Sequence, residues 1–332
     1  MTRLSPILTT QMLDHKIIDQ AREALGDAEK ILVTSHINPD GDAVCSVLAL
    51  GLALHYEGKQ VQMVLDNGFA SAFRHLEGTE NIVRKGEGPV DLVVALDCAD
   101  HQRVGDLVKD FPTVDINIDH HVTNTNYGDI NLVDGQSVAT CALLAEHFLA
   151  LGLDFSPPIV NAMMTGLLTD TLGLRTSNMN AKALRIAADL VERGANLPAL
   201  YERALLNRSF EAMRYWGAGL SQLQREDELV WAVLSLEDRE AVGYPGSDDA
   251  ELVNALSAID GAAITVLFIE QPNKQVKISW RSRGEYDVAE IASSFGGGGH
   301  IAAAGAAVSG TLAEVQEKVL EATRTALAGV KA

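Results

Sequence analysis

The chain has 332 residues, 47% of them hydrophobic and 21% charged, a length and composition that indicate two globular domains of unequal size. Its 26 basic and 45 acidic residues give a net charge of −19, and without a basic run this charge disfavours binding to long duplex nucleic acid. The sequence shows neither an apolar run of about 18 residues nor a secretory signal pattern, which predicts a cytoplasmic protein without a membrane partner.

In the first part of the chain, short β-branched segments alternate with segments of helical period. Strands are expected at 31–35, 61–65, 92–96 and 114–118. Helices are expected at 43–57, 137–151, 159–169 and 180–193, and Gly58, Gly152 and Gly194 follow three of them in the position that often ends a helix. This alternation predicts an α/β domain over residues 1–195, with a mainly parallel sheet flanked by helices.

After this domain the pattern changes. Residues 196–225 predict a helical linker without a strand, and residues 226–332 predict a smaller domain of mixed α+β structure. Strands are expected at 229–234, 262–269 and 275–280, the last two paired as an antiparallel hairpin, and a helix is expected at 311–328. We expect the active-site cleft to lie between the two domains.

The first chemical motif directly follows the first predicted strand, where His36, Asp40 and Asp42 flank Pro39 and Gly41. In parallel sheets the carboxyl ends of the strands are the edge that binds ligands, so these side chains are candidate metal ligands. The alternative is a solvated loop in which Asp40 or Asp42 only caps the next helix.

Further groups that could bind a metal follow two other predicted strands. Asp97 ends the strand at 92–96, and Asp119, His120 and His121 follow the strand at 114–118. Asp170 follows an apolar helical segment. Taken alone, Asp97 could cap a loop and Asp170 could be a surface acid, but the delivery of Asp or His from three strand ends to one edge predicts a site.

The composition of this group of residues indicates the metal. Carboxylates and imidazoles without a thiolate suit Mn²⁺, with Mg²⁺, Co²⁺ and Fe²⁺ as competitors, better than a structural zinc ion. A shared carboxylate would hold two divalent ions about 3.5–4 Å apart, a spacing that suits in-line displacement at phosphorus by activated water.

The last motif lies in the second predicted domain. Glycines that let backbone N–H groups approach a phosphate, with cationic side chains nearby, would form an anion-binding site, whereas a lone glycine run would be a flexible linker. The candidate substrate-binding residues are Arg281, Arg283, Gly297, Gly298, Gly299 and His300.

These motifs, in this order, resemble the DHH phosphoesterase superfamily together with its nucleotide-binding associated C-terminal domain. The resemblance covers roughly residues 25–325 and is strongest to the group of stand-alone nanoRNases and pAp phosphatases. It implies that His36, Asp40 and Asp97 hold one ion, and that Asp42, Asp97, His120 and Asp170 hold the second. It also implies that His121 faces the phosphate, that Asp119 orients its neighbours, and that the C-terminal residues named above bind the nucleotide.

The activity implied is Mn²⁺-dependent hydrolysis of short oligonucleotides, from two to about five nucleotides, to mononucleotides, or of pAp to AMP and phosphate. Partners would be small nucleotides or short single strands, and the protein would be a monomer or homodimer. Alternatives are a cyclic or linear dinucleotide phosphodiesterase and, in another class, a non-catalytic nucleotide sensor. The sequence departs from the family pattern at Cys45 and Leu172, where glycine is usual.

Overall fold

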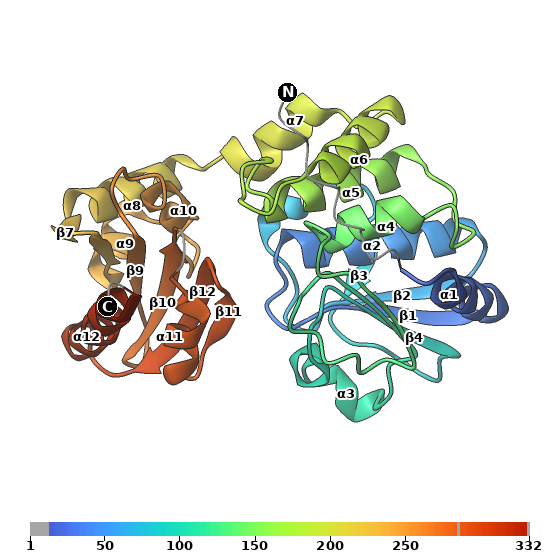
Figure 1. The fold of residues 1–332 in the computed structure, drawn as a ribbon, viewed down its shortest axis with the longest axis horizontal. Helices are drawn as coiled ribbons and strands as arrows, with labels where there is room; N and C mark the ends of the chain where they lie inside the picture. The colour runs from blue at the N-terminus through green and yellow to red at the C-terminus, as the bar shows by residue number, and fades with distance from the viewer. Residues whose placement is uncertain (1–12, 284–285, 331–332) are drawn as a thin grey trace, which may run out of the picture. The chain divides into compact units, whose positions relative to one another are not determined.

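The computed structural model describes residues 13–283 and 286–330, and its contacts divide the chain into two units, Met1–Asn207 and Arg208–Ala332 (Figure 1). The predicted division into a catalytic domain, a linker from 196 to 225 and a substrate-binding domain stays a prediction. Among the described residues, no helix is both long and apolar enough to cross a membrane.

A sheet of six parallel strands forms the centre of the first unit, in the order β3-β2-β1-β4-β5-β6. The strands are β1 (Lys30–Thr34), β2 (Gln60–Val64), β3 (Ile82–Val83), β4 (Leu92–Leu96), β5 (Ile116–Asp119) and β6 (Ile130–Val133). The strand order reverses between β1 and β4, and the carboxyl ends of the strands at such a switch point open a crevice for a ligand. The predicted α/β fold is therefore confirmed.

Helices lie on both sides of this sheet, some against the strands and others against neighbouring helices. They are α1 (His15–Asp27), α2 (Gly41–Tyr56), α3 (Leu107–Asp110), α4 (Thr140–His147), α5 (Pro157–Asp170), α6 (Ala181–Glu192) and α7 (Leu197–Tyr201). Along β1, Ile31 and Val33 pack with α2 and α5 in one core, whereas Leu32 packs with the α3 side in another. The alternation of a strand's side chains thus supplies both layers. Figure 1 shows α2, α4 and α5 on one side of the sheet and α3 on the other.

Helix α2 is the central helix of the unit. All its residues from Gly41 to Leu54 are buried, because the sheet covers one side of it and α5 the other. The two helices approach closely at glycines: a Cβ atom on Gly41 would lie 2.3 Å from Thr169 Oγ1, and one on Gly166 would lie 2.8 Å from Asp42 Oδ1. This close approach brings the end of α5 to the start of α2.

The expectations for the first unit were incomplete: helices α1 and α3 were not predicted, and α4 ends at His147 instead of 151. Strands β3 and β6 were not predicted, because each is short and only partly buried, so neither gives a clear apolar run. Helix α4 begins at Thr140 instead of 137, because the backbone N–H of Ser137 donates to Asp134 O in a turn and Ala139 is extended.

The second unit contains a mixed sheet in the order β11-β12-β10-β9-β8-β7. Its strands are β7 (Gln224–Glu226), β8 (Leu229–Leu234), β9 (Ile264–Gln271), β10 (Gln275–Ser282), β11 (Gly298–His300) and β12 (Ala303–Ser309). The antiparallel hairpin of β9 and β10 is confirmed, and β8 and β9 are parallel. The prediction that 196–225 holds no strand was wrong, because β7 is an exposed edge strand that only its pairing with β8 defines.

The helices of the second unit are α8 (Phe210–Ser221), α9 (Leu236–Val242), α10 (Leu252–Leu256), α11 (Val288–Ser294) and α12 (Leu312–Val330). A one-turn π-helix, Glu202–Leu206, precedes the boundary between the units. The core under α12 is built around the buried Trp280, whose indole N–H donates to Thr323 Oγ1 over 3.2 Å.

Candidate metal centre

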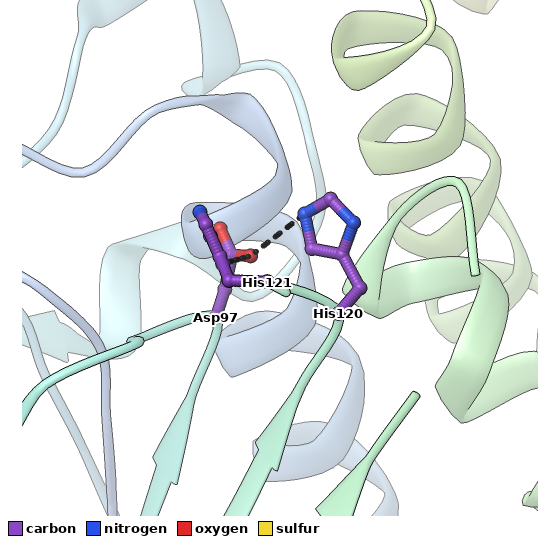
Figure 2. Close-up of side chains that lie close together, drawn as sticks. All are labelled: Asp97, His120 and His121. Carbon is purple, nitrogen blue, oxygen red and sulfur yellow. Dashed lines mark ion pairs between the residues drawn. The ribbon is translucent and has the colours of Figure 1, made fainter. Parts of the chain in front are cut away.

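The carboxyl ends of β1, β4 and β5 deliver the predicted ligands to the switch point of the parallel sheet. His36 follows β1, and Asp42 lies in the first turn of α2. Asp97 follows β4, and His120 and His121 follow β5. Figure 2 shows Asp97 and His120 pointing toward each other from neighbouring strands.

Asp97 lies at the centre of this group. Its Oδ1 is 3.5 Å from His120 Nε2 and 3.7 Å from His121 Nδ1, and its Oδ2 is 3.9 Å from His36 Nε2. Only 1% of Asp97 is exposed. Its φ of 52° lies in the left-handed region, which aspartate tolerates better than most residues.

Asp170 is the last residue of α5 and also belongs to this group, because its Oδ2 lies 3.5 Å from His120 Nε2. The carbonyl end of a helix disfavours a carboxylate and favours a cation. Leu172, Gly173 and Leu174 then follow in the left-handed region, with φ of 48°, 78° and 68°. This turn ends α5 abruptly at the site.

Within residues 13–283 and 286–330, three sets of side chains bring possible ligand atoms within 4.8 Å of one another. They are His36, Asp40 and Asp97; Asp42, His120 and Asp170; and Asp97, His120 and His121. The first set contains the residues implied for one ion, and the second contains three of the four implied for the other, while Asp97 is grouped with His120 in the third set. Asp40 also caps α2, since its Oδ1 accepts from the N–H groups of Asp42 and Ala43.

The imidazoles of His36 and His120 are oriented alike by the backbone. His36 Nδ1 lies 2.9 Å from Ile37 O, and His120 Nδ1 lies 3.3 Å from Ser137 O. A proton on Nδ1 satisfies each carbonyl and directs the Nε2 lone pair toward the carboxylates. Donation of the second ring N–H to a carbonyl is the usual arrangement of a histidine that binds metal.

The carboxylates of this group cannot all ionise easily without a cation. Burial, with the charges of Asp42, Asp40, Asp170 and Asp119, raises the pKa of Asp97 well above its ordinary value. Burial also raises the pKa of Asp42 and of Asp170. Imidazole lone pairs and clustered carboxylates are acceptors that repel one another, so this donor set fits divalent cations.

Comparisons with known proteins agree with this geometry. A sequence model of the DHH family's N-terminal domain matches residues 30–167, and one of the DHHA1 domain matches residues 240–329. Over 299 residues the chain is 35% identical to the bifunctional oligoribonuclease and PAP phosphatase NrnA of Thermus thermophilus, which covers 90% of both proteins. This chain belongs to the DHH family.

Two further proteins support this assignment. The protein of the same name from Mycoplasma genitalium is 24% identical over 297 residues, covering 88% of this DHH-family chain and 92% of the relative. The crystal structure of an exopolyphosphatase-related protein from Bacteroides fragilis matches with a TM-score of 0.88 and 26% identity, over 97% of this chain and 98% of the other. The folds of both units therefore have a solved counterpart.

Thr140 is a residue of the DHH-family site that the sequence did not reveal. Its backbone N–H donates to Asp42 Oδ2 over 2.5 Å, and the N–H of Cys141 donates to Asp42 Oδ1 over 3.0 Å. The hydroxyl of Thr140 donates to Asp97 Oδ1 over 2.9 Å. The N-terminus of α4 thus holds two of the predicted ligands, but the expected start at 137 had placed Thr140 inside the helix.

The buried Asp119 contacts His121 and also Asn124, which lies outside the run Asp119–His121. Its Oδ1 lies 2.6 Å from His121 Nδ1, and its Oδ2 accepts from Asn124 Nδ2 over 2.6 Å. Asn117, fully buried in β5, lies beside Asn124. Neither asparagine was singled out from the sequence. An asparagine in a buried strand and another shortly after the two histidines were the available signals.

In the second unit, the candidate substrate-binding arginines contact backbone and side-chain acceptors. Arg281 Nε donates to Asn254 Oδ1 over 3.1 Å, and Arg283 Nη2 donates to Ser257 O over 2.6 Å. Both His300 and Arg281 pair with Ala303, from the two sides of β12, so their backbones lie in one row across the sheet. The side chain of His300 is outside the part of the chain that the structure describes.

The glycine run has a structural explanation at two positions. A Cβ atom on Gly297 would lie 2.1 Å from Gly305 O, and one on Gly299, with φ of 149°, would lie 2.4 Å from Ala303 O. Gly298 has nothing within 4 Å of its ideal Cβ. The run is not a flexible linker, since Gly298–His300 form β11, and the N–H of Gly297 donates to Ala292 O. The anion-binding site expected at these glycines stays a prediction.

Proposed function

We propose that this chain hydrolyses phosphoester bonds, cleaving short oligonucleotides to mononucleotides and pAp to AMP and phosphate. The observation that carries the proposal is the buried group of aspartates and histidines around Asp97 in a chain that is 35% identical to NrnA of Thermus thermophilus over 90% of its length. That relative is named a bifunctional oligoribonuclease and PAP phosphatase.

Two divalent ions, most simply Mn²⁺, would occupy the group. His36, Asp40 and Asp97 would hold one ion, and Asp42, Asp97, His120 and Asp170 would hold the other, which makes Asp97 the shared ligand. When bound, such ions supply Lewis-acid stabilisation of phosphoryl charge and activation of water. Oxygen and imidazole ligands without thiolates favour Mn²⁺ or a similar ion over zinc.

The remaining residues would act on the substrate. Asp119, through its contact with Nδ1, would hold the ring of His121 so that Nε2 meets a phosphoryl oxygen. In its protonated form this ring could donate a hydrogen bond to charge that develops on the phosphate. His121 would thus stabilise charge on the phosphate, Asp119 would orient the His121 ring, and Asp97 would hold the two metal ions.

Residues of the second unit would bind the nucleotide. Arg281 and Arg283 would pair with a phosphate, because a guanidinium forms charge-assisted hydrogen bonds with its oxygens. Backbone N–H groups of Gly297 to Gly299 and the His300 ring would add donors. The proposal includes a cytoplasmic location, small nucleotides or short single strands as partners, and a monomer or homodimer.

The test is an assay of pAp, a linear dinucleotide, a pentanucleotide, a cyclic dinucleotide and pyrophosphate, each with Mn²⁺. We expect the wild type to cleave pAp and the linear substrates, and Asp97→Asn to lose this activity by at least about a thousandfold. Asp129→Asn, at an exposed position of the same unit, is the control and should retain it. Failure of the wild type on pAp and the linear substrates would contradict the proposal, and preference for pyrophosphate would reassign the substrate.

A further inference from the structure

Asn124 is hydrogen-bonded to the carboxylate of Asp119, which in turn contacts His121. Its Nδ2 lies 2.6 Å from Asp119 Oδ2 and 2.8 Å from Asn117 Oδ1, so its two amide hydrogens have two close acceptors. On the other side of the same carboxylate, Asp119 Oδ1 lies 2.6 Å from His121 Nδ1. Asn124, Asp119 and His121 thus form a chain of hydrogen bonds that ends at the imidazole.

The amide of Asn124 can take only one orientation. Its Oδ1 accepts from the backbone N–H of Asn126 over 2.7 Å, which leaves Nδ2 to face Asp119. The backbone N–H of Asn124 also donates to His121 O over 3.1 Å, and Asn126 lies in the left-handed region with φ of 53°. A flipped amide would place an oxygen against the carboxylate and an NH₂ group against an N–H donor.

This bracing extends to the loop after Asp97. Asn117 Nδ2 lies 3.3 Å from Ala95 O, Cys98 O and Tyr127 Oη, and the N–H of Thr125 donates to Ala99 O over 2.9 Å. The turn after β5 is therefore fixed to the turn after β4. The position of the imidazole and that of the central aspartate depend on one polar network.

Asp119 would be held poorly without Asn124. It is completely buried, so its carboxylate oxygens need hydrogen-bond partners within the protein. The N–H of His120 and the ring of His121 both use Oδ1, so Asn124 is the side chain that secures Oδ2. Loss of this donor would allow the carboxylate to rotate about its Cβ–Cγ bond.

We propose that Asn124 is a positioning residue, which acts through Asp119 to fix the ring orientation and tautomer of His121. The proposal rests on the phosphoester hydrolysis proposed above. Asn124 does not need to touch the substrate or an ion. Partners behind a functional imidazole typically contribute about 10- to 100-fold to activity or metal affinity.

Asn124→Asp is the sharpest variant, because it keeps the shape and the acceptor for the N–H of Asn126 but replaces the donor with a carboxylate oxygen. Asn131→Asp is the matched control: Asn131 is also half-buried and braces a loop, with Nδ2 donating to Gly128 O over 2.6 Å. Asn124→Ser, which shortens the side chain, covers the case in which Asn124→Asp does not fold.

With pAp and Mn²⁺, we expect kcat of Asn124→Asp to fall by about 10- to 100-fold, KM to change by less than about threefold, and bound Mn²⁺ to stay at the wild-type level. Asn131→Asp should retain kcat within about threefold. Equal losses in both variants, an unchanged kcat in Asn124→Asp, or loss of bound metal in parallel with activity would overturn the positioning role.

A second readout does not depend on activity. In ¹⁵N NMR spectra of the metal-free protein, at a pH where the ring is neutral, His121 should carry its proton on Nδ1. Asn124→Asp and Asn124→Ser should show a mixture of the two neutral tautomers. A His121 pattern identical to that of the wild type in both variants contradicts the proposal. If the wild type fails to hydrolyse any substrate, the proposed function fails, but this spectrum still decides whether Asn124 sets the tautomer.

Discussion

The hydroxyl of Thr140 donates a hydrogen bond to Asp97 Oδ1 over 2.9 Å, and so connects the first turn of α4 to the aspartate at the centre of the group. The backbone N–H of the same residue holds Asp42. One residue thus supports two predicted metal ligands, the first through its side chain and the second through its backbone.

Thr140→Val removes the hydroxyl, keeps the shape and preserves the backbone contact to Asp42. We expect Mn²⁺ affinity to fall by about 10- to 100-fold, because Asp97 loses a partner that orients it. Titration calorimetry measures this. Thr165→Val is the control, since the buried hydroxyl of Thr165 bonds within α5 to Asn161 O. A wild-type affinity in Thr140→Val would show that the hydroxyl does not position the ligand.

Gly166 lies where α5 packs closely against Cys141 and Asp42. A Cβ atom there would lie 2.3 Å from Cys141 Sγ and 2.8 Å from Asp42 Oδ1. We expect Gly166→Ala to cost about 1–3 kcal/mol of unfolding free energy and to weaken Mn²⁺ binding, because α5 or Asp42 must move.

Gly217→Ala provides the contrast for this prediction. Gly217 is exposed in α8, with nothing within 4 Å of its ideal Cβ. The alanine there should stabilise the protein by up to about 1 kcal/mol, since alanine is the better helix former. Chemical denaturation of both variants gives the comparison, and equal stability changes would contradict the predicted clash.

Stability of the metal-free protein should depend on pH through Asp97. Its pKa is raised in the folded state, by burial first and by neighbouring carboxylates second. The folded chain therefore binds more protons at Asp97 than the unfolded chain does above about pH 4. As a result, the free energy of unfolding decreases as the pH rises towards and through the raised pKa.

Calorimetric Tm values of the metal-free wild type and of Asp97→Asn, measured between about pH 5 and pH 8, test this linkage. The Tm of the wild type should fall relative to that of the variant as the pH rises, because asparagine does not titrate. Added Mn²⁺ should stabilise the wild type more at the higher pH, since protons compete for the ligands. A Tm difference that does not change with pH contradicts the raised pKa.

Much of the first unit could be predicted because several of its strands are apolar runs that are followed directly by aspartate or histidine. Asp97 and His120 follow such runs, and the parallel arrangement brings them to one edge. The partners Thr140 and Asn124 could not be found in this way. Their roles depend on where α4 begins and on how the turn after β5 folds, which are set by tertiary hydrogen bonds.

The second unit was harder to predict at its edges. β7 is exposed along its length, and β12 consists largely of small residues, so neither shows the periodicity of a strand. From the sequence, Gly297 and Gly299 predicted a phosphate-binding loop. In the structure, a Cβ atom at either position would also clash with the neighbouring backbone. Leu172 illustrates the opposite case: it lies at φ of 48°, a conformation that favours the glycine usual in the family pattern.

The central claim is that the aspartates and histidines around Asp97 bind two divalent ions. Anomalous diffraction at the manganese edge from crystals soaked in Mn²⁺ tests it most directly. We expect two peaks, one on either side of the Asp97 carboxylate: the first beside His36 and Asp40, and the second beside Asp42, His120 and Asp170. A single peak, peaks away from Asp97, or no peak at this edge of the sheet would contradict it.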